Sequence, residues 1–321
     1  MIPKDAKIFI CGHRGMVGRA CVRKFEKEGY ANILKRTHAE LDLRNQQAVK
    51  AFFEAEKPEY VVLAGAKVGG IMANKMHCAE FLVENLEIQN NVIMQSFRNG
   101  VKKFCFLGSS CIYPCKAPQP IKEEYLLTGP LEPTNEGYAL AKIAGYKLCL
   151  YLSKEYGWNT VSLMPCNLYG TNDNYDLVNG HVFPTFIKRF VDAARENRPE
   201  EVLWGTGKPL REFLHVDDVA NAVYFFLQNH NEPEVINVGY GSDVTIKELA
   251  GKIAKAAGAG RLQAQVRQHR RRDRCLCPEG RPRRTGEEGR SGQGRHRPLR
   301  QGRAPRGRLL CPVRRQRRRP H

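Results

Sequence analysis

Two side chains that could exchange a proton with a substrate lie four residues apart, at Tyr138 and Lys142. On a helix, residues four apart share a face, so the ammonium group would lie close to the phenol oxygen. A free phenol has a pKa near ~10, and a neighbouring cation stabilises the phenolate and lowers that value. The pair therefore indicates a tyrosine that works as an acid or base. A buried tyrosine beside a solvated lysine on an ordinary helix has the same spacing, so further residues must support the interpretation.

Ser109 follows an apolar segment, residues 103–108, that predicts a buried strand. In open α/β sheets, ligands bind at the carboxyl ends of the strands. We therefore predict that Ser109 donates a hydrogen bond to a substrate carbonyl and completes a set with Tyr138 and Lys142. Taken alone, a serine at this place would more often be a turn residue.

The first apolar segment, residues 8–11, runs directly into the glycine-rich motif Gly12-His13-Arg14-Gly15-Met16-Val17-Gly18. An amphipathic helix pattern follows to about Glu28. A strand, a glycine turn and a helix together place backbone N–H groups at the positive end of a helix, where a pyrophosphate can approach closely. A glycine triplet alone is weak evidence, but in this order it predicts nucleotide binding.

The second predicted strand ends at Arg36, where an NAD-binding fold usually carries an acidic residue for the ribose 2′-hydroxyl. Lys35 and His38 lie beside Arg36 instead, and Arg14 lies in the glycine motif. Cations in this position favour a 2′-phosphate, so we predict NADP(H) rather than NAD(H), unless Arg14 and Arg36 are merely solvated. Asp42, a few residues further on, is placed to meet the adenine amine.

The rest of the first 258 residues alternates between strand and helix patterns. Strand patterns occur at 60–64, at 161–170, where the strand ends in a ligand-facing loop, at 202–205 and at 235–239. Helix patterns occur at 79–99, 219–227 and 245–257, and residues 181–189 are expected to begin a helix in the smaller lobe. Residues 40–43 are also expected to begin a helix. This alternation predicts the α/β class, with a Rossmann-like doubly wound parallel sheet.

We divide the chain into a NADP-binding Rossmann domain and a smaller C-terminal substrate lobe. The domain spans residues 1–170, with a return segment at about 212–238, and the lobe spans 171–211 and 239–258 and is expected to be incomplete. Residues 259–321 are expected to be an aberrant tail.

The tail, from residue 261 onward, carries most of the net charge of +19, with 21 Arg against four acidic residues. It contains no Lys, Phe, Tyr, Trp, Ile, Met or Asn, so it has little to bury and should be disordered. A GC-rich gene read out of frame produces such a mixture, and we hypothesise a frameshift near residues 258–262. Translation of the other two reading frames would test this.

Cysteine usage and the N-terminus predict the compartment. The 11 cysteines form no C-x-x-C pair, and those before the tail are scattered through apolar segments, as reduced thiols would be. Residues 1–7 lack the apolar core of a signal peptide, and no apolar run reaches membrane-spanning length. We expect a cytoplasmic protein without membrane attachment, and no metal site.

These motifs together resemble the extended short-chain dehydrogenase/reductase family, which carries a glycine triplet, a serine and Tyr-x-x-x-Lys in this order. Within that family the chain is similar to the GDP-L-fucose synthase branch, over residues 7 to about 258. The segments that carry this similarity are 12–18, 66–70, 108–114, 131–136 and 211–218. The resemblance implies NADPH-dependent conversion of GDP-4-keto-6-deoxy-D-mannose to GDP-L-fucose, by epimerisation at carbons 3 and 5 and reduction at carbon 4.

The resemblance also implies roles for residues that would otherwise be unremarkable. Cys111 would be the base and His181 the acid of the epimerisation, although alone they would be a small core residue and a loop histidine. In the reduction, Tyr138 would supply the proton, Lys142 would hold its pKa down and bind the ribose, and Ser109 would polarise the ketone.

Further contacts implied by the resemblance concern the two ligands and a partner subunit. Cofactor contacts beyond the glycine motif and Arg36 are Asp42, Leu43, Leu107, Gly108, Lys142, Pro165, Asn167, Leu168 and His181. Substrate contacts are Arg189, Trp204 and Arg211, any of which could instead be structural. A homodimer is expected through helices near residues 80–99 and 138–155.

Two other functions compete with this one. An NAD-dependent nucleotide-sugar 4-epimerase or 4,6-dehydratase would share the fold and Tyr138 with Lys142, but would normally carry an acid at the end of the second strand. Nucleic-acid binding through the Arg-rich tail belongs to another class of function, because such a tail would condense on phosphates. Deletion of residues 261–321 would discriminate between an enzyme and a nucleic-acid binder.

Overall fold

The computed structural model describes residues 1–177, 180–258 and 263–267. These residues belong to the first of two units into which the chain divides, residues 1–270. Most of the predicted aberrant tail, 259–262 and 268–321, lies outside the described residues, and the frameshift hypothesis stays a prediction. The five residues 263–267 form a strand, however, in a segment that the sequence pattern assigned to the tail.

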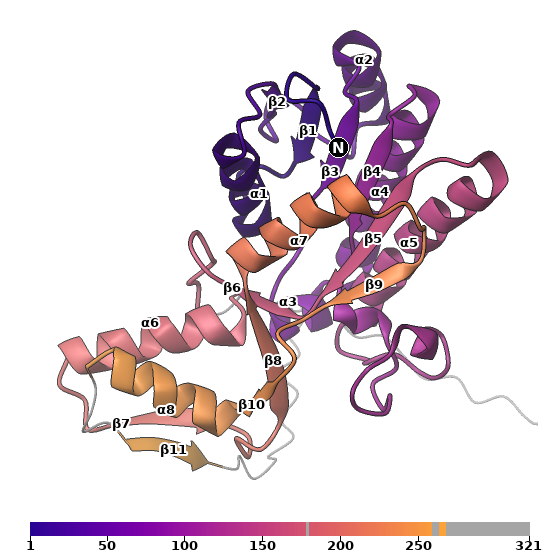
Figure 1. The fold of residues 1–321 in the computed structure, drawn as a ribbon. Coiled ribbons are helices and arrows are strands. Elements are labelled where there is room, and N and C mark those ends of the chain that lie inside the picture. Colours follow the sequence, from indigo (N-terminus) through magenta and orange to yellow (C-terminus); the bar gives the residue numbers. More distant parts are fainter. Residues whose placement is uncertain (178–179, 259–262, 268–321) are drawn as a thin grey trace, which may run out of the picture. The chain divides into compact units, whose positions relative to one another are not determined.

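A six-stranded parallel sheet in the order β2-β1-β3-β4-β5-β9 forms the centre of the first region (Figure 1). Its strands are β1 Ile8–Cys11, β2 Ile33–Leu34, β3 Tyr60–Leu63, β4 Lys103–Leu107, β5 Thr160–Pro165 and β9 Val235–Val238. Every residue of β1, β4 and β5 is buried, as expected where helices cover both faces of a sheet. The doubly wound α/β fold predicted from the sequence is confirmed.

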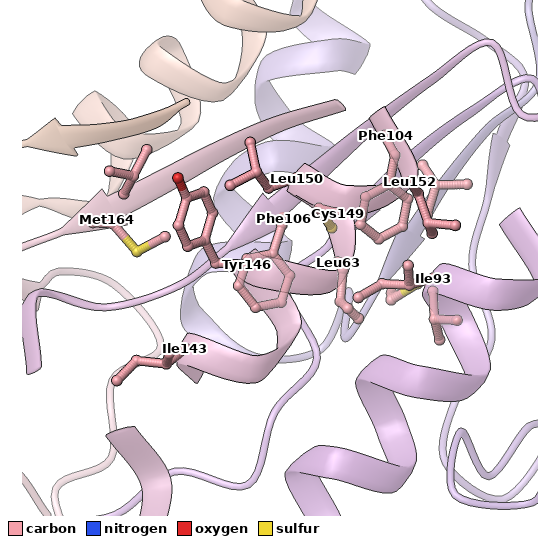
Figure 2. Close-up of a cluster of buried hydrophobic side chains, with 14 of the residues drawn as sticks. Leu63, Ile93, Phe104, Phe106, Ile143, Tyr146, Cys149, Leu150, Leu152 and Met164 are labelled. Carbon is pink, nitrogen blue, oxygen red and sulfur yellow. The ribbon is translucent and has the colours of Figure 1, made fainter. Parts of the chain in front are cut away.

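Side chains that alternate along each strand separate two cores. From β1, Ile8 and Ile10 face helices α1 (Met16–Lys27) and α7 (Val216–Asn229). Phe9 belongs to the opposite core, with α2 (Gln46–Glu56), α4 (Cys78–Arg98) and α5 (Glu136–Tyr156). Figure 2 shows part of that second core, where Tyr146 of α5 lies beside Phe106 of β4 and Leu152 of α5 beside Phe104. Packing in these two cores holds α1 and α5 against opposite faces of the sheet, and most residues of the candidate site lie on or near these two helices.

Smaller sheets form the second lobe. Strands β10 (Asp243–Thr245), β8 (Leu210–His215) and β6 (Asn167–Tyr169) make one sheet, and β7 (Glu200–Trp204) pairs in parallel with β11 (Gln263–Arg267). Helices α6 (Val182–Arg195) and α8 (Ile246–Ala256) supply most of its apolar core. Thr245 begins α8 through a reciprocal pair of hydrogen bonds with Glu248, which satisfies two N–H groups of the first turn.

Three short elements and one correction complete the fold. The short elements are α3 Ile71–Met76 and the 3-10 turns η1 Ser110–Ile112 and η2 Glu123–Tyr125. The helix expected to begin at residues 40–43 starts only at Gln46, because the Asn45 side chain accepts from the backbone N–H of Ala48. Residues 37–41 instead form a turn, in which Glu40 accepts from the backbone N–H of Thr37.

The described part of the chain contains no helix that is both long and apolar enough to cross a membrane. Within the same residues, no group of His, Cys, Asp and Glu is arranged to hold a metal ion. The eight cysteines of the described ranges are free thiols.

Candidate active site

Helix α5 carries the Tyr138 and Lys142 pair into the interior. Tyr138 is half-buried and Lys142 is buried, and the Lys142 Nζ lies 5.6 Å from the centre of the Tyr138 ring. The same Nζ donates a 2.8 Å hydrogen bond to the carbonyl of Leu107, the last residue of β4. Gln89 of α4 donates to the carbonyl of Ala141, so α5 is held against α4 between the two functional residues.

Ser109 and Cys111 follow directly from the end of β4. A Cβ at Gly108 would collide with the sulfur of Met164, so a larger residue here would displace the Met164 side chain of β5. The Ser109 Oγ accepts a 3.4 Å hydrogen bond from the Cys111 backbone N–H and caps η1. The end of β4 and the first turns of α5 therefore bring Ser109 and Cys111 to Tyr138 and Lys142.

Burial shifts the pKa of each titratable group in this cluster toward its neutral form. Burial raises the pKa of Cys111 to about 11, opposed by the hydrogen bond from Ser109 and by the charge of Lys142. Burial lowers the pKa of Lys142 to about 8, opposed by a Cys111 thiolate. The opposing effects show that the cysteine and the lysine stabilise each other's charge.

The pKa of Tyr138 differs from the sequence expectation. It is raised, first by burial and then by the charge of Cys111, rather than lowered by Lys142. The physical reason is that the phenol loses its hydration while the ammonium of Lys142 is directed at the Leu107 carbonyl. A raised pKa keeps Tyr138 protonated, which is the state that a proton donor requires.

His181 comes from the start of α6, not from β4 or α5, which carry the cluster. It is the N-cap residue of α6, as the sequence pattern predicted for the start of a helix, and its side chain makes no capping hydrogen bond. Burial lowers the pKa of His181, and the carboxylate of Asp173 opposes that shift. Among the described residues no hydrogen bond or ion pair joins His181 to Cys111, so the structure does not connect the predicted epimerisation pair directly.

The glycine motif forms a close turn at the start of α1. Gly12 has a φ of 75°, and a Cβ there would lie 2.6 Å from the Cα of Gly65. A Cβ at Gly18 would collide with the carbonyl oxygen of Gly12. Gly15 is the N-cap of α1 and provides no capping side chain, so the N–H groups of the first turn, from Met16 and Val17 onward, stay available for a phosphate.

A basic pocket of about 520 Å³ lies beside this turn. Its lining residues are His13, Arg14, Arg19, Val22, Arg23, Lys35, Thr37 and Asn172. Two of its cations have acidic partners, since Lys35 pairs with Glu26 and Arg23 with Asp217. Arg14 is exposed and makes no ion pair within the described ranges, so its guanidinium is available for an anion.

Arg36, unlike Arg14, forms an ion pair, so its guanidinium is not available for an anion in the basic pocket. Its Nη2 lies 2.5 Å from a carboxylate oxygen of Glu56, and the guanidinium lies over the ring of Phe52. The prediction that Arg14 and Arg36 act together on a 2′-phosphate therefore receives support at Arg14, whereas Arg36 is engaged with α2. Sequence reasoning missed Glu56 because it lies 20 residues away.

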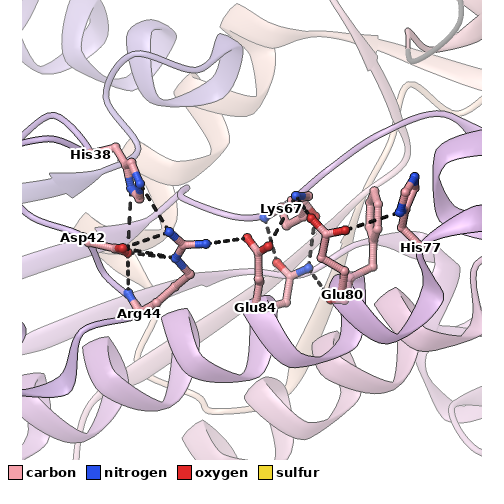
Figure 3. A network of polar contacts seen from close by, with 9 residues as sticks. His38, Asp42, Arg44, Lys67, His77, Glu80 and Glu84 are labelled. Carbon is pink, nitrogen blue, oxygen red and sulfur yellow. Dashed lines mark hydrogen bonds and ion pairs between the residues drawn. The ribbon is translucent and has the colours of Figure 1, made fainter.

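A second pocket, of about 310 Å³, adjoins the basic one and is lined by Gly12, Leu43 and Gly65 among others. Asp42 lies on its wall, but Arg44 binds both oxygens of the Asp42 carboxylate and lowers its pKa. Figure 3 shows the network that extends from this pair. It joins Arg44 to Glu84, Glu84 to Lys67, Lys67 to Glu80, and Glu80 to His77.

The pockets, the glycine turn and the exposed arginine fit a dinucleotide with an extra phosphate. The second pocket, whose walls include Leu41 and Leu43, has space for an adenosine. The glycine turn allows the close approach of a pyrophosphate, and the basic pocket has the charge for a further phosphate. The sequence pattern did not indicate the network around Asp42 and Arg44. Through the Arg44–Glu84 ion pair, this network links the wall of the second pocket to α4.

The segment after β5 lies at the same edge of the sheet. Pro165 ends β5, the Asn167 side chain donates to the carbonyl of Glu212 in β8, and Leu168 packs partly buried against the core. Asn167 is thus engaged with the second lobe, and its predicted cofactor contact stays a prediction.

The residues predicted to contact the substrate differ in whether their side chains already bind other parts of the protein. Arg189 is tied into the lobe, because it binds the buried Glu201 and donates to the carbonyl of Val202. Arg211 is exposed on β8, and among the described residues its guanidinium donates only to the carbonyl of its neighbour Leu210. Trp204 ends β7, and its side chain lies outside the described parts.

Comparisons with known proteins show the family to which this chain belongs. The sequence model described as "NAD dependent epimerase/dehydratase family" matches residues 8–239. The chain is 55% identical over 258 residues to an Arabidopsis thaliana protein named "Putative GDP-L-fucose synthase 2", covering 80% of this chain and 79% of the relative. It is 48% identical over 261 residues to the "GDP-L-fucose synthase" of Escherichia coli (strain K12), covering 78% and 81%.

A solved structure of "MlghC, GDP-mannoheptose C4 reductase from Campylobacter jejuni with NADP bound" is similar with a TM-score of 0.77 and 37% identity, over 84% of this chain and 90% of that one. The matched family segment contains the glycine turn, the Ser109 to Cys111 segment and the Tyr138 and Lys142 pair. The chain therefore belongs to the NAD dependent epimerase/dehydratase family.

Proposed function

We propose that this chain is a bifunctional, NADPH-dependent epimerase and reductase that converts GDP-4-keto-6-deoxy-D-mannose to GDP-L-fucose. The observation that carries the proposal is the cluster of Ser109, Cys111, Tyr138 and Lys142 at the end of β4. A plain reductase needs the serine, tyrosine and lysine, but has no need for a half-buried thiol beside them. Relatives at 48–55% identity that carry the name GDP-L-fucose synthase support the substrate.

The reduction uses three side chains of the cluster. NADPH, when bound, supplies a hydride to carbon 4 of the sugar. Tyr138, whose raised pKa keeps it protonated, gives its proton to the ketone oxygen, and the Ser109 hydroxyl donates a hydrogen bond to the same oxygen. Lys142 supplies positive charge under the site, and its bond to the Leu107 carbonyl holds that charge in place.

The epimerisation needs a base and an acid near carbons 3 and 5. Protons on these carbons are acidic because the adjacent ketone takes up the negative charge as an enolate. Cys111 is the base: its thiolate, once formed, is stabilised by Lys142 and by the Ser109 hydroxyl. His181 is the acid, delivered from the start of α6.

The cofactor site favours NADPH over NADH through Arg14. Its exposed guanidinium has no described acidic partner, and the basic pocket places His13 and Lys35 beside it. An NAD-dependent 4-epimerase or 4,6-dehydratase would place an acid at this point, so these rivals fit the pocket less well.

The direct test is incubation of the purified chain with GDP-4-keto-6-deoxy-D-mannose and NADPH, followed by the loss of NADPH absorbance. We expect oxidation of NADPH and formation of GDP-L-fucose. Turnover with NADH alone, or conversion without any net oxidation of cofactor, would favour the 4-epimerase alternative.

Cys111→Ser separates the two half-reactions. We expect it to abolish the uptake of solvent deuterium at carbons 3 and 5, because a serine hydroxyl is a far weaker base than a thiolate. Cys115→Ser is the matched control, since Cys115 is an exposed thiol four residues away. Normal deuterium uptake in Cys111→Ser would remove that residue from the base role.

We also propose that the enzyme is a homodimer through α4 and α5. Exposed apolar side chains support this, with Val83 on α4 and Leu140 and Tyr151 on α5. Sedimentation of Val83→Arg is expected to show monomers where the parent chain forms dimers. A parent chain that sediments as a monomer would contradict this assembly. A cytoplasmic location, expected from the sequence, stays a prediction.

A further inference from the structure

The short turn that carries Cys111, η1, is held only weakly by its own backbone. The Cys111 N–H donates to the Ser109 Oγ over 3.4 Å, and the N–H groups of Ile112 and Tyr113 donate over 3.3 Å to the carbonyls of Ser109 and Ser110. These distances are longer than those of most N–H···O bonds in proteins. The position of the Cys111 side chain therefore depends on what anchors the residues on either side of it.

The residue that ends this turn, Tyr113, is anchored to the last strand of the central sheet. Its side chain is 4% exposed and packs in the core that α5 shares with β4. Its hydroxyl donates a 2.6 Å hydrogen bond to the Oδ1 of Asn237 in β9. A hydroxyl buried to this extent has little access to water, so loss of the bond would leave both groups without a partner.

Asn237 is held in the orientation that this bond requires. Its Nδ2 donates a 3.1 Å hydrogen bond to the carbonyl of Ile121, and a carbonyl can only accept. The amide oxygen therefore faces Tyr113, whose hydroxyl must be the donor. Burial, and then the charge of Glu123, raises the pKa of Tyr113, which the bond to Asn237 opposes in part, so the hydroxyl keeps the proton that it donates.

The backbone of Asn237 is fixed on both sides of β9. On one side it pairs with Met164 of β5 in the parallel sheet. β9 is the last strand in the order of that sheet, and on its outer side the Asn237 N–H donates a 3.0 Å hydrogen bond to the Oε1 of Glu123 in η2. Asn237 thus joins three parts of the chain, which are β5, the end of the turn after Cys111, and the segment 121–123.

We propose that Tyr113 and Asn237 are positioning residues for the epimerisation, and that their hydrogen bond holds the turn that presents Cys111 to the sugar. This rests on the proposed function, in which Cys111 is the base. Proton abstraction needs the sulfur at a defined distance from the carbon, and a small misplacement of a catalytic group lowers the rate strongly. Lys142 is held by the Leu107 carbonyl instead, so the reduction should depend much less on this bond.

The first test needs no substrate, so it can fail independently of the proposed function. Tyr113→Phe keeps the buried ring and removes the hydroxyl. Hydrogen exchange of the full chain, followed by mass spectrometry, should show peptides that span residues 110–113 exchanging about tenfold faster than in the parent, with β1 and β3 unchanged.

Tyr125→Phe is the matched control for this exchange experiment. Tyr125 lies in η2 and is partly buried against the same core, and its hydroxyl makes no hydrogen bond within the described ranges. It should exchange as the parent does at residues 110–113. Unchanged exchange at these residues in Tyr113→Phe, or an equal acceleration in β1 and β3, overturns the proposal.

The second test separates the two half-reactions. In Tyr113→Phe, the rate of solvent deuterium uptake at carbons 3 and 5 should fall about tenfold, in kcat rather than KM, which corresponds to a barrier change of ~1.4 kcal/mol. NADPH oxidation by the ketone that is already epimerised at both carbons should change by less than about threefold. Equal losses in the two measurements would mean a general structural role and would overturn the proposal, as would unchanged deuterium uptake.

Asn237→Leu tests the other end of the bond. It removes the acceptor at similar volume, and should give the same division between deuterium uptake and NADPH oxidation. The double variant, Tyr113→Phe with Asn237→Leu, should lose no more uptake than Asn237→Leu alone, because both changes remove one interaction. Additive losses in the double variant would show that the two residues act separately and would contradict the proposed pair.

Discussion

The sheet region and the second lobe position their functional groups by different means. Ser109, Cys111, Tyr138 and Lys142 are set by a fully buried strand and a helix packed across it, so their relative positions follow from the core. His181 is the N-cap residue of α6 in the second lobe, and its side chain makes no capping hydrogen bond. The comparison teaches that the sheet region determines the geometry of the chemistry, whereas the lobe supplies groups whose state depends on a few local contacts.

In both regions, one of the arginines predicted to bind a ligand is exposed and the other forms an ion pair. In the sheet region Arg14 is exposed while Arg36 is engaged with Glu56, and in the lobe Arg211 is exposed while Arg189 is engaged with Glu201. Of the two arginines predicted as ligand contacts in each region, one is thus available for an anionic ligand and the other stabilises the fold. Substitutions in the two members of each pair should therefore have opposite consequences for binding and for stability.

The largest expected effect concerns the sheet region. Tyr138→Phe should lower kcat for the reduction by about 10³-fold, within the range for loss of a general acid. Tyr156→Phe is the control, because Tyr156 is the last residue of the same helix and is 64% exposed. Steady-state NADPH oxidation measures both, and a kcat within threefold of the parent in Tyr138→Phe would show that the cluster does not work as described.

A pH dependence of stability should follow from Lys142. Burial lowers its pKa to about 8 from an ordinary value of 10.5. The unfolded chain therefore binds more protons between these two values, so the cost of burying the charge is complete below pH 8 and fades as the pH rises toward 10.5. Lys142→Met should remove this cost, and its advantage in unfolding free energy over the parent should shrink by about 2 kcal/mol between pH 7 and pH 10.

Urea unfolding of both proteins at the two pH values measures that difference. Because all other titrating groups are common to the two chains, their effects cancel in the comparison. A constant difference between pH 7 and pH 10 would mean that the lysine is not desolvated in the folded protein.

In the lobe, the two arginines should separate stability from binding. Arg189→Ala leaves Glu201, whose side chain is 7% exposed, with Arg198 as its remaining partner, and should cost about 2 kcal/mol of unfolding free energy. Arg211→Ala should leave thermal unfolding unchanged and raise the KM for the GDP-sugar about tenfold. Equal losses of stability in both variants would show that Arg211 is structural too.

The smallest effects are expected at the cofactor pocket. Arg14→Ala should raise the KM for NADPH severalfold and leave that for NADH unchanged. Arg36→Ala should cost at most about 1 kcal/mol of stability, because its ion pair is about a third exposed, and should alter cofactor choice less. Thermal melts and the ratio of kcat/KM for the two cofactors measure both, and a greater loss of NADPH selectivity in Arg36→Ala than in Arg14→Ala would reverse the assignment.

Elements whose signals are local could be predicted from the sequence. Most strands of the six-stranded sheet, the glycine turn and α4 lie within one or two residues of their predicted bounds, because apolar periodicity and glycine spacing act over a few residues. The short strands β8 and β10 of the second lobe were not predicted. The start of α2 was misplaced, because the Asn45 cap decides it rather than the acidic residues before it. Strand β11 was missed, because its partner β7 lies about sixty residues away and its own sequence contains one strongly apolar residue, Val266.

The sequence by itself determined the fold class, the residue types of the cluster and their order along the chain. Only the tertiary structure decided which arginines are free, that Lys142 binds the Leu107 carbonyl, and that Tyr138 has a raised rather than a lowered pKa. It also brought Asp173 into the electrostatic environment of His181. The physical reason is that the charge state and the freedom of a side chain depend on burial and on partners distant in sequence, which spacing along the chain does not encode.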